Sequence, residues 1–76
     1  MNNARRKIIT ELMDIIVDAK DNLEEVKNEE EESRDNIPEN LQESPRYEMA
    51  EEACNSLEEA VSLLGEAIEK MMELTE

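Results

Sequence analysis

The sequence predicts an all-α protein, an antiparallel hairpin of two long helices with coiled-coil-like packing that dimerises into a four-helix bundle. Two long stretches carry apolar residues at alternating spacings of three and four, and a proline-containing segment of about ten residues separates them. The two stretches have nearly equal lengths, which favours an antiparallel hairpin. We expect a single domain over residues 1–76, and a domain this small is marginally stable unless it is helical, stapled or oligomeric.

The first helix is expected over residues 3–33. Its apolar series follows an a/d spacing over nearly three heptads. This series comprises Ile9, Leu12, Ile16, Ala19, Leu23 and Val26. The pattern does not decide whether the helix is continuous through Asn22 and Asn28.

The connection over residues 34–44 contains two apolar residues, Ile37 and Leu41. Ile37 precedes Pro38 and is therefore biased away from helical geometry, and the segment "PENL" favours one helical or 3₁₀ turn. One interpretation is a structured plug, in which both apolar side chains cover the end of the hairpin over Val26, Tyr47 and Ala50. The other interpretation is an ordinary connection with two incidental apolar residues.

The second helix is expected over residues 45–74. Ser44 can cap its first turn and Pro45 suits the first helical position, because proline has no backbone N–H to satisfy. The a/d series of this helix covers more than three heptads. It comprises Tyr47, Ala50, Cys54, Leu57, Val61, Leu64, Ile68 and Met71.

Both helices carry more apolar residues than one partner helix covers, and the excess lies at the end distant from the connection. Such a patch usually marks a protein interface. The expected homodimer interface comprises Ile8, Met13, Ile15, Val17, Met71, Met72 and Leu74, with Ala60 and Ala67 beside the seam. The alternative is a wide core in a bent hairpin. At the same end we expect Arg5, Arg6 and Lys7 to pair with Glu69, Glu73 and Glu76.

The composition offers little for catalysis. The chain has no histidine, one glycine and one cysteine, which argues against His-dependent catalysis, most zinc sites and a glycine-rich phosphate loop. Cys54 lies in the apolar series and is expected to be a packed small residue. The acidic segment "NEEEESRDN" lacks the alternating ligands and the central glycine of a calcium loop. We therefore expect no enzyme, no cofactor and no metal site.

The location expected from the sequence is the bacterial cytoplasm. A single cysteine suggests a reducing compartment. Glu11 and Asp14 interrupt the N-terminal apolar stretch, so it matches neither a signal peptide nor a membrane span.

Acidic residues dominate the charge, with 22 acids, eight bases and a formal net charge of −14. This balance argues against direct binding to nucleic acid or anionic lipid. Seven acids recur every three or four residues along the first helix, about 5 to 6 Å apart, near the spacing of phosphates along a nucleic-acid strand. This acidic stripe comprises Glu11, Asp14, Asp18, Asp21, Glu25, Glu29 and Glu32. It is either an imitation of nucleic acid that binds a basic groove on a partner protein, or a solvated helical face.

The segment "RDNIPENLQESPRYEMAEEACNSLEEAVSLLGEAIEKM" resembles one shared by small acidic helical proteins of bacteriophages and other mobile elements of Firmicutes. In those proteins an "NIPENLQ" turn precedes a Ser/Pro-Arg-Tyr helix start. The resemblance covers about half of the chain, from Arg34 to Met71, and implies a mobile-element origin. Directional side chains beside the two apolar residues of the connection can serve recognition or local capping. They are Asn36, Ile37, Asn40, Leu41, Arg46 and Tyr47.

The function expected from these patterns is a small, non-enzymatic protein-binding module. The leading hypothesis is a phage-type inhibitor of a host defence or nucleic-acid-processing protein, with a basic or nucleic-acid-binding partner and no direct contact to nucleic acid or membrane. The alternative is a structural or assembly protein that acts through self-association of helical bundles.

Overall fold

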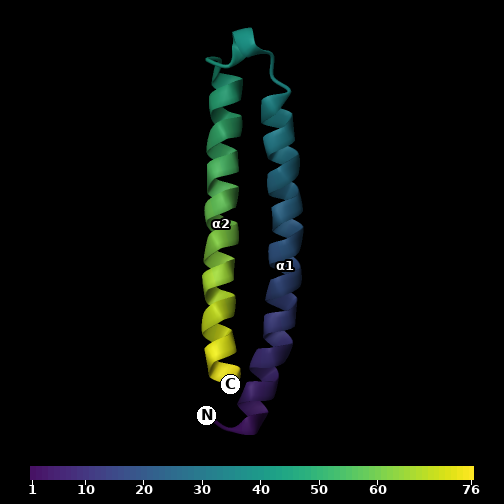
Figure 1. The fold of residues 1–76 in the computed structure, drawn as a ribbon, viewed down its shortest axis with the longest axis vertical. Coiled ribbons are helices and arrows are strands. Elements are labelled where there is room, and N and C mark those ends of the chain that lie inside the picture. The colour runs from purple at the N-terminus through teal and green to yellow at the C-terminus, as the bar shows by residue number, and fades with distance from the viewer.

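The computed structural model describes residues 1–76 and is an antiparallel helical hairpin without strands (Figure 1). Helix α1 spans Asn3–Asp35, the 3₁₀ turn η1 spans Glu39–Leu41, and helix α2 spans Pro45–Thr75. The molecule is a rod of 59 × 14 × 14 Å with both termini at the end opposite η1. The predicted helical hairpin is confirmed, and α1 is continuous through Asn22 and Asn28.

Capping residues fix where the helices begin. The Oδ1 atom of Asn2 accepts the backbone N–H of Arg5 at 2.8 Å at the start of α1. At the start of α2, Ser44 Oγ accepts the N–H of Tyr47 at 3.3 Å, and Pro45 follows as the first helical residue. Both caps satisfy an N–H group that has no partner within the helix.

Of the two apolar residues expected to cover the end of the hairpin, only one is buried. Ile37 is buried, with 6% of its surface exposed, whereas Leu41 is 48% exposed. The backbone N–H of Leu41 donates to Pro38 O at 2.8 Å, and Leu41 O accepts from the Ser44 N–H at 3.0 Å. These bonds hold η1 as a tight turn whose last side chain reaches solvent, so only Ile37 closes the end of the hairpin.

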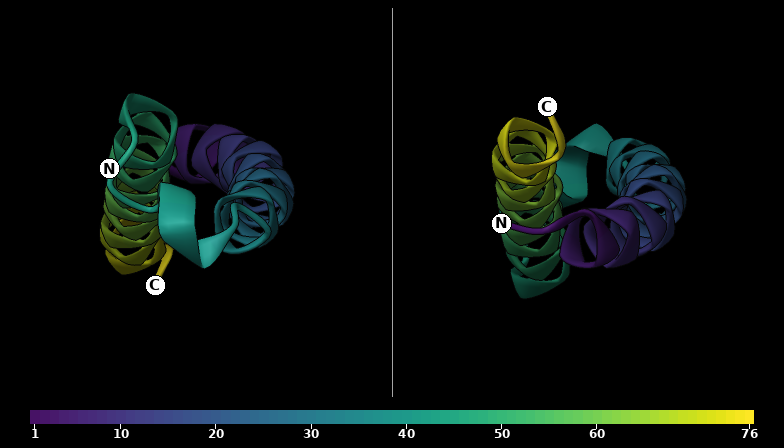
Figure 2. Two further views of the ribbon diagram at one scale, coloured as in Figure 1. Left: turned by 90° about the horizontal axis from the view of Figure 1, so that it is seen from above. Right: turned by 90° about the horizontal axis from the view of Figure 1, so that it is seen from below.

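Helix α2 contacts α1 through its predicted apolar series. Cys54 and Val61 are buried, and the other members of the series are half-buried. Figure 2, viewed along the rod, shows that α1 is bowed beside the straighter α2.

Helix α1 contacts α2 through a different series from the predicted one. Ile9, Ile16 and Leu23 are half-buried as expected, but Leu12, Ala19 and Val26 are exposed. Half-buried residues one position further along the chain take their places. They are Met13, Lys20 and Lys27, and the same series continues to Arg6 and Arg34. Lysine and arginine can occupy such positions because their aliphatic stems pack while their charged ends reach water.

The hairpin buries little. Three of its 76 residues are buried, namely Ile37, Cys54 and Val61, and the total accessible surface is 5856 Å². A compact monomer of this mass exposes about 4,800 Å². The free hairpin therefore exposes about 1,000 Å² more surface than a compact protein of its size.

Candidate interaction surfaces

One side of the seam between the helices is closed by charged residues of α1. Lys20 Nζ lies 3.2 Å from Glu24 Oε1, and Lys27 Nζ lies 3.9 Å from Glu31 Oε1. The Cε atom of Lys20 lies 3.5 Å from the point where a Cβ would stand on Gly65 of α2. The stem of Lys20 thus packs against α2, and the ammonium groups of Lys20 and Lys27 each have a carboxylate one turn further along α1.

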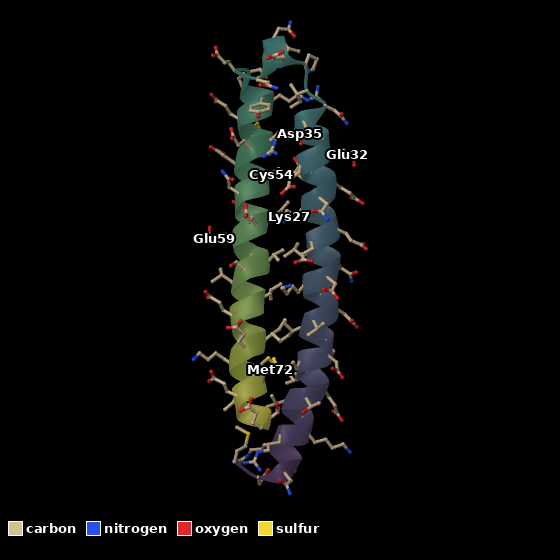
Figure 3. All side chains as sticks on the ribbon, viewed as in Figure 1. Lys27, Glu32, Asp35, Cys54, Glu59 and Met72 are labelled. Carbon is tan, nitrogen blue, oxygen red and sulfur yellow. The ribbon has the colours of Figure 1, made fainter.

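Arg34 continues this layer towards the connection. Its Nε atom lies 3.1 Å from Asp35 Oδ1, a hydrogen bond that raises the pKa of the guanidinium. Figure 3 shows Lys27 and Cys54 near the seam, below the connection.

The opposite side of the seam is open. Near the connection it forms a hollow of about 500 Å³ lined by Glu30 and Ser33 of α1, Ile37 of the connection, and Arg46, Met49, Ala50 and Ala53 of α2. The charged residues of this lining, Glu30 and Arg46, form no ion pair, so no layer comparable to that of Lys20 and Lys27 closes this side.

A continuous apolar face adjoins the open side. Its positions lie one residue before those of the seam in each helix, and we call them together the apolar face. On α1 they are Arg5, Ile8, Leu12, Ile15, Ala19, Asn22, Val26, Glu29 and Ser33. On α2, beyond its first turn, they are Met49, Ala53, Ser56, Ala60, Leu63, Ala67, Lys70 and Leu74. All nine α1 positions are exposed, as are six of the eight on α2.

The two halves of the apolar face lie on the same broad side of the hairpin. A rotation of 180° about a line perpendicular to the plane of the hairpin exchanges two antiparallel helices and leaves each broad side in place. Residues with the same offset from the seam therefore point to the same side. The hollow agrees with this geometry, because Ser33 of α1 and Ala53 of α2 both line it.

The apolar face almost excludes acids. Only one of the 22 acidic residues, Glu29, occupies any of its 17 positions, and the face also carries Arg5 and Lys70. On a chain with a net charge of −14, this face has a formal charge of +1. Its large exposed side chains include Ile15 at 64% and Leu63 at 56% exposure.

The residues predicted for a dimer interface do not form one surface. Ile8, Ile15 and Leu74 belong to the apolar face, whereas Met13 and Met71 are half-buried in the seam. Val17 and Met72 are exposed one position after the seam, which places them on the opposite broad side. The sequence pattern located the excess of apolar residues but not the side on which it lies.

The acidic stripe is fully exposed and unpaired. None of its seven carboxylates forms an ion pair, and all seven residues are exposed. Six of them point away from the seam and the apolar face, and Glu29 lies on the apolar face. Figure 3 shows Glu32 of α1 and Glu59 of α2 directed outwards from the two sides of the rod.

The basic residues do not compensate this charge. Four of the eight are half-buried in the seam, namely Arg6, Lys20, Lys27 and Arg34. Only three acids are half-buried, so the exposed side chains comprise 19 acids and four bases. Half of the basic side chains therefore lie between the helices, and the exposed surface is more acidic than the composition indicates.

The expected ion pairs at the terminal end do not form. Arg6 Nη1 donates to Asn3 Oδ1 at 3.2 Å, and Glu73 pairs instead with Lys70 at 3.6 Å. The helices are therefore held side by side by packing alone, since no ion pair joins α1 to α2.

The polar residues of the connection serve mainly local structure. Asn36 closes α1, since its backbone N–H donates to Glu32 O at 3.0 Å, and Tyr47 is half-buried in the seam. Arg46 lines the hollow and forms no ion pair with the acids at the end of α1. Asn40 is exposed on η1.

Cys54 is buried in the seam, and its burial raises the pKa of the thiol above its ordinary value. The neutral thiol is therefore the form at physiological pH, which suits packing rather than nucleophilic chemistry. No group of three or more cysteine, aspartate or glutamate side chains is arranged to hold a metal ion. No helix combines the length and apolarity needed to cross a membrane.

Comparison with known proteins gives no family: no family model, no curated protein and no solved structure matches the chain.

Proposed function

We propose that this chain is a non-enzymatic protein-binding module that forms a homodimeric four-helix bundle and presents its acidic stripe to a basic partner protein. The partner binds nucleic acid, and the acidic stripe occupies the surface that otherwise holds phosphates. The proposed setting is the cytoplasm of a bacterial host, where a phage-type inhibitor of a defence or nucleic-acid-processing protein acts. The resemblance of the connection to mobile-element proteins favours this setting.

The observation that carries the proposal is the separation of charge between the seam and the outer surface. Solubility of a small domain requires a net charge of magnitude about 2–8, and this chain carries −14. Here four basic side chains are half-buried between the helices, and none of the seven carboxylates of the acidic stripe forms an ion pair. Such unpaired charges steer and select a partner of the opposite sign.

The dimensions of the acidic stripe fit this role. From Glu11 to Glu32 it runs about 32 Å at 1.5 Å per residue. This length presents carboxylates to a basic groove on a rigid and continuous support, so binding does not require ordering a flexible chain.

The experiment is affinity capture from bacterial lysate, with the bound proteins identified by mass spectrometry. A stripe variant carries Asp14→Asn, Asp18→Asn and Asp21→Asn. A control variant carries Glu39→Gln, Glu43→Gln and Glu76→Gln, which remove the same charge from exposed positions outside the acidic stripe. Circular dichroism establishes that all three proteins have the same helical content.

We expect the native protein and the control to recover the same nucleic-acid-binding protein, and the stripe variant to recover at least about tenfold less. With that partner purified, rising salt and added DNA should both weaken the complex. Equal loss in the stripe and control variants would mean that net charge alone matters. Full retention by the stripe variant would show a solvated face and favour the alternative function, assembly through self-association.

A further inference from the structure

We propose that the apolar face is the dimer interface, covered along the length of α1 by the same face of a second copy, with the two connections at opposite ends of the four-helix bundle. This inference rests on the proposed homodimer and specifies its surface and orientation. It replaces the loop-distant patch that the sequence alone suggested, because that set of residues is divided among three sides of the hairpin.

Charge selects a second copy as the occupant. The strongly acidic chains repel one another everywhere except on a surface from which acids are absent. The apolar face is that surface, with one acid among its 17 positions. A basic partner would gain nothing from binding there, whereas two copies that meet through it keep six of the seven carboxylates of each acidic stripe in solvent, all except Glu29.

The incomplete closure of the seam also points to this face. The stem of Lys20 covers the seam beside Gly65, and the buried residues Cys54 and Val61 lie in the row on that side. Leu57 and Leu64 lie in the row next to the apolar face and remain half-buried. A layer of apolar side chains from another molecule would complete their burial.

The area required is present. Stable interfaces bury about 800 Å² on each partner. The hairpin exposes 5856 Å², which exceeds the surface of a compact monomer by about 1,000 Å². Burial of the apolar face would bring the exposed surface of each copy close to the ordinary value.

The charged residues on the apolar face of α1 set the orientation. Arg5 and Glu29 lie towards opposite ends of the α1 series. If α1 packs against α1 of a second copy running the other way, with a two-fold axis at Ala19, Arg5 comes within one turn of Glu29 of the second copy. Leu12 then meets Val26 of the second copy, and Ala19 meets its own equivalent.

The arrangement with both connections at one end is less favourable. Lys20 lies at the same height along the rod as Gly65. Because the helices are antiparallel and rise equally per residue, two residues at the same height on α1 and α2 have numbers whose sum is about 85. With both connections at one end, Glu29 would face Ser56 of the second copy, and Arg5 would lie beyond the end of α2. Neither charge would have a partner.

The test compares Ile15→Glu with Val17→Glu by sedimentation equilibrium. Both positions are exposed, β-branched and on α1, and both variants add one carboxylate, but Ile15 lies on the apolar face and Val17 on the opposite side. We expect the native protein and Val17→Glu to be dimers. In Ile15→Glu, dimerisation should weaken at least about a hundredfold, because the interface would bury two unpaired charges. Circular dichroism verifies folding of each variant.

Orientation is tested in a Cys54→Ala background by oxidation of Ala19→Cys, with Val17→Cys as the control. We expect a covalent dimer from Ala19→Cys only. A native dimer that Ile15→Glu leaves intact would overturn the assigned face while leaving the proposed homodimer in place. A monomeric native protein would overturn both, and failure of Ala19→Cys to cross-link in a dimer would overturn the orientation.

Discussion

Replacement of Ile37 by alanine tests whether the connection stabilises the hairpin. Ile37 is 6% exposed and is one of three buried residues in the chain. Isoleucine-to-alanine changes in cores lower the free energy of unfolding by about 2–5 kcal/mol. Ile37 borders the open hollow, so its removal leaves no closed cavity, and we expect the lower part of this range, about 2–3 kcal/mol.

For a domain of this size, 1 kcal/mol shifts the unfolding temperature by about 4–8 °C. Ile37→Ala should therefore lower the Tm by about 10 to 20 °C. The control is Leu41→Ala, at the 48% exposed apolar residue of the same connection, which should cost less than about 1 kcal/mol. Both are measured by thermal circular dichroism at one protein concentration, because association makes Tm depend on concentration. Equal shifts in the two variants would refute the assignment of Ile37 as the residue that closes the hairpin.

Three further changes probe α2. Gly65→Ala should raise the free energy of unfolding by about 0.5–1 kcal/mol in urea titrations, because alanine favours helix and its Cβ would make only an ordinary contact with Lys20 Cε at 3.5 Å. A decrease would mean that the lysine stem cannot move aside. Ser44→Ala removes the acceptor for the Tyr47 N–H and should cost about 1 kcal/mol in the same assay, whereas an unchanged midpoint would contradict the cap. Burial raises the pKa of the Cys54 thiol, so its contribution to stability is complete below about pH 8.5, where the thiol of the unfolded chain begins to ionise, and declines as pH rises. Between about pH 8 and pH 10, the free energy of unfolding should therefore fall more steeply with pH in the native protein than in Cys54→Ala. Parallel profiles of the two proteins would contradict this.

Local signals sufficed for the hairpin and for α2. Ser44 and Pro45 mark the start of α2 through a side-chain acceptor and a missing N–H, both of which act within one helical turn. Every position of the series from Tyr47 to Met71 is apolar, whereas the neighbouring series on α2 is interrupted by Ser56 and Lys70, so the contact face of this helix follows from its spacing.

Helix α1 shows why spacing alone was insufficient there. It carries two series offset by one residue, and the more apolar one, with Leu12 and Val26, is the exposed one. The series with Lys20 and Lys27 contacts α2, where the stem of Lys20 packs beside Gly65. Which series of α1 contacts α2 depends on the α2 residues that lie opposite each position of α1. The spacing of residues along α1 alone does not contain that information. Each of the two series contains one acid, Glu29 or Glu30, so acid content did not separate them either.

The pairing of level residues also has a consequence for the order of folding. Residues near the connection, such as Arg34 and Cys54, are separated by about twenty positions, whereas Lys20 and Gly65 are separated by 45. The entropy lost on closing a loop grows with its length, so contacts nearest the connection form at the lowest cost. We expect the hairpin to zip from Ile37 towards the termini. The end distant from the connection is then the last to close and the first to fray.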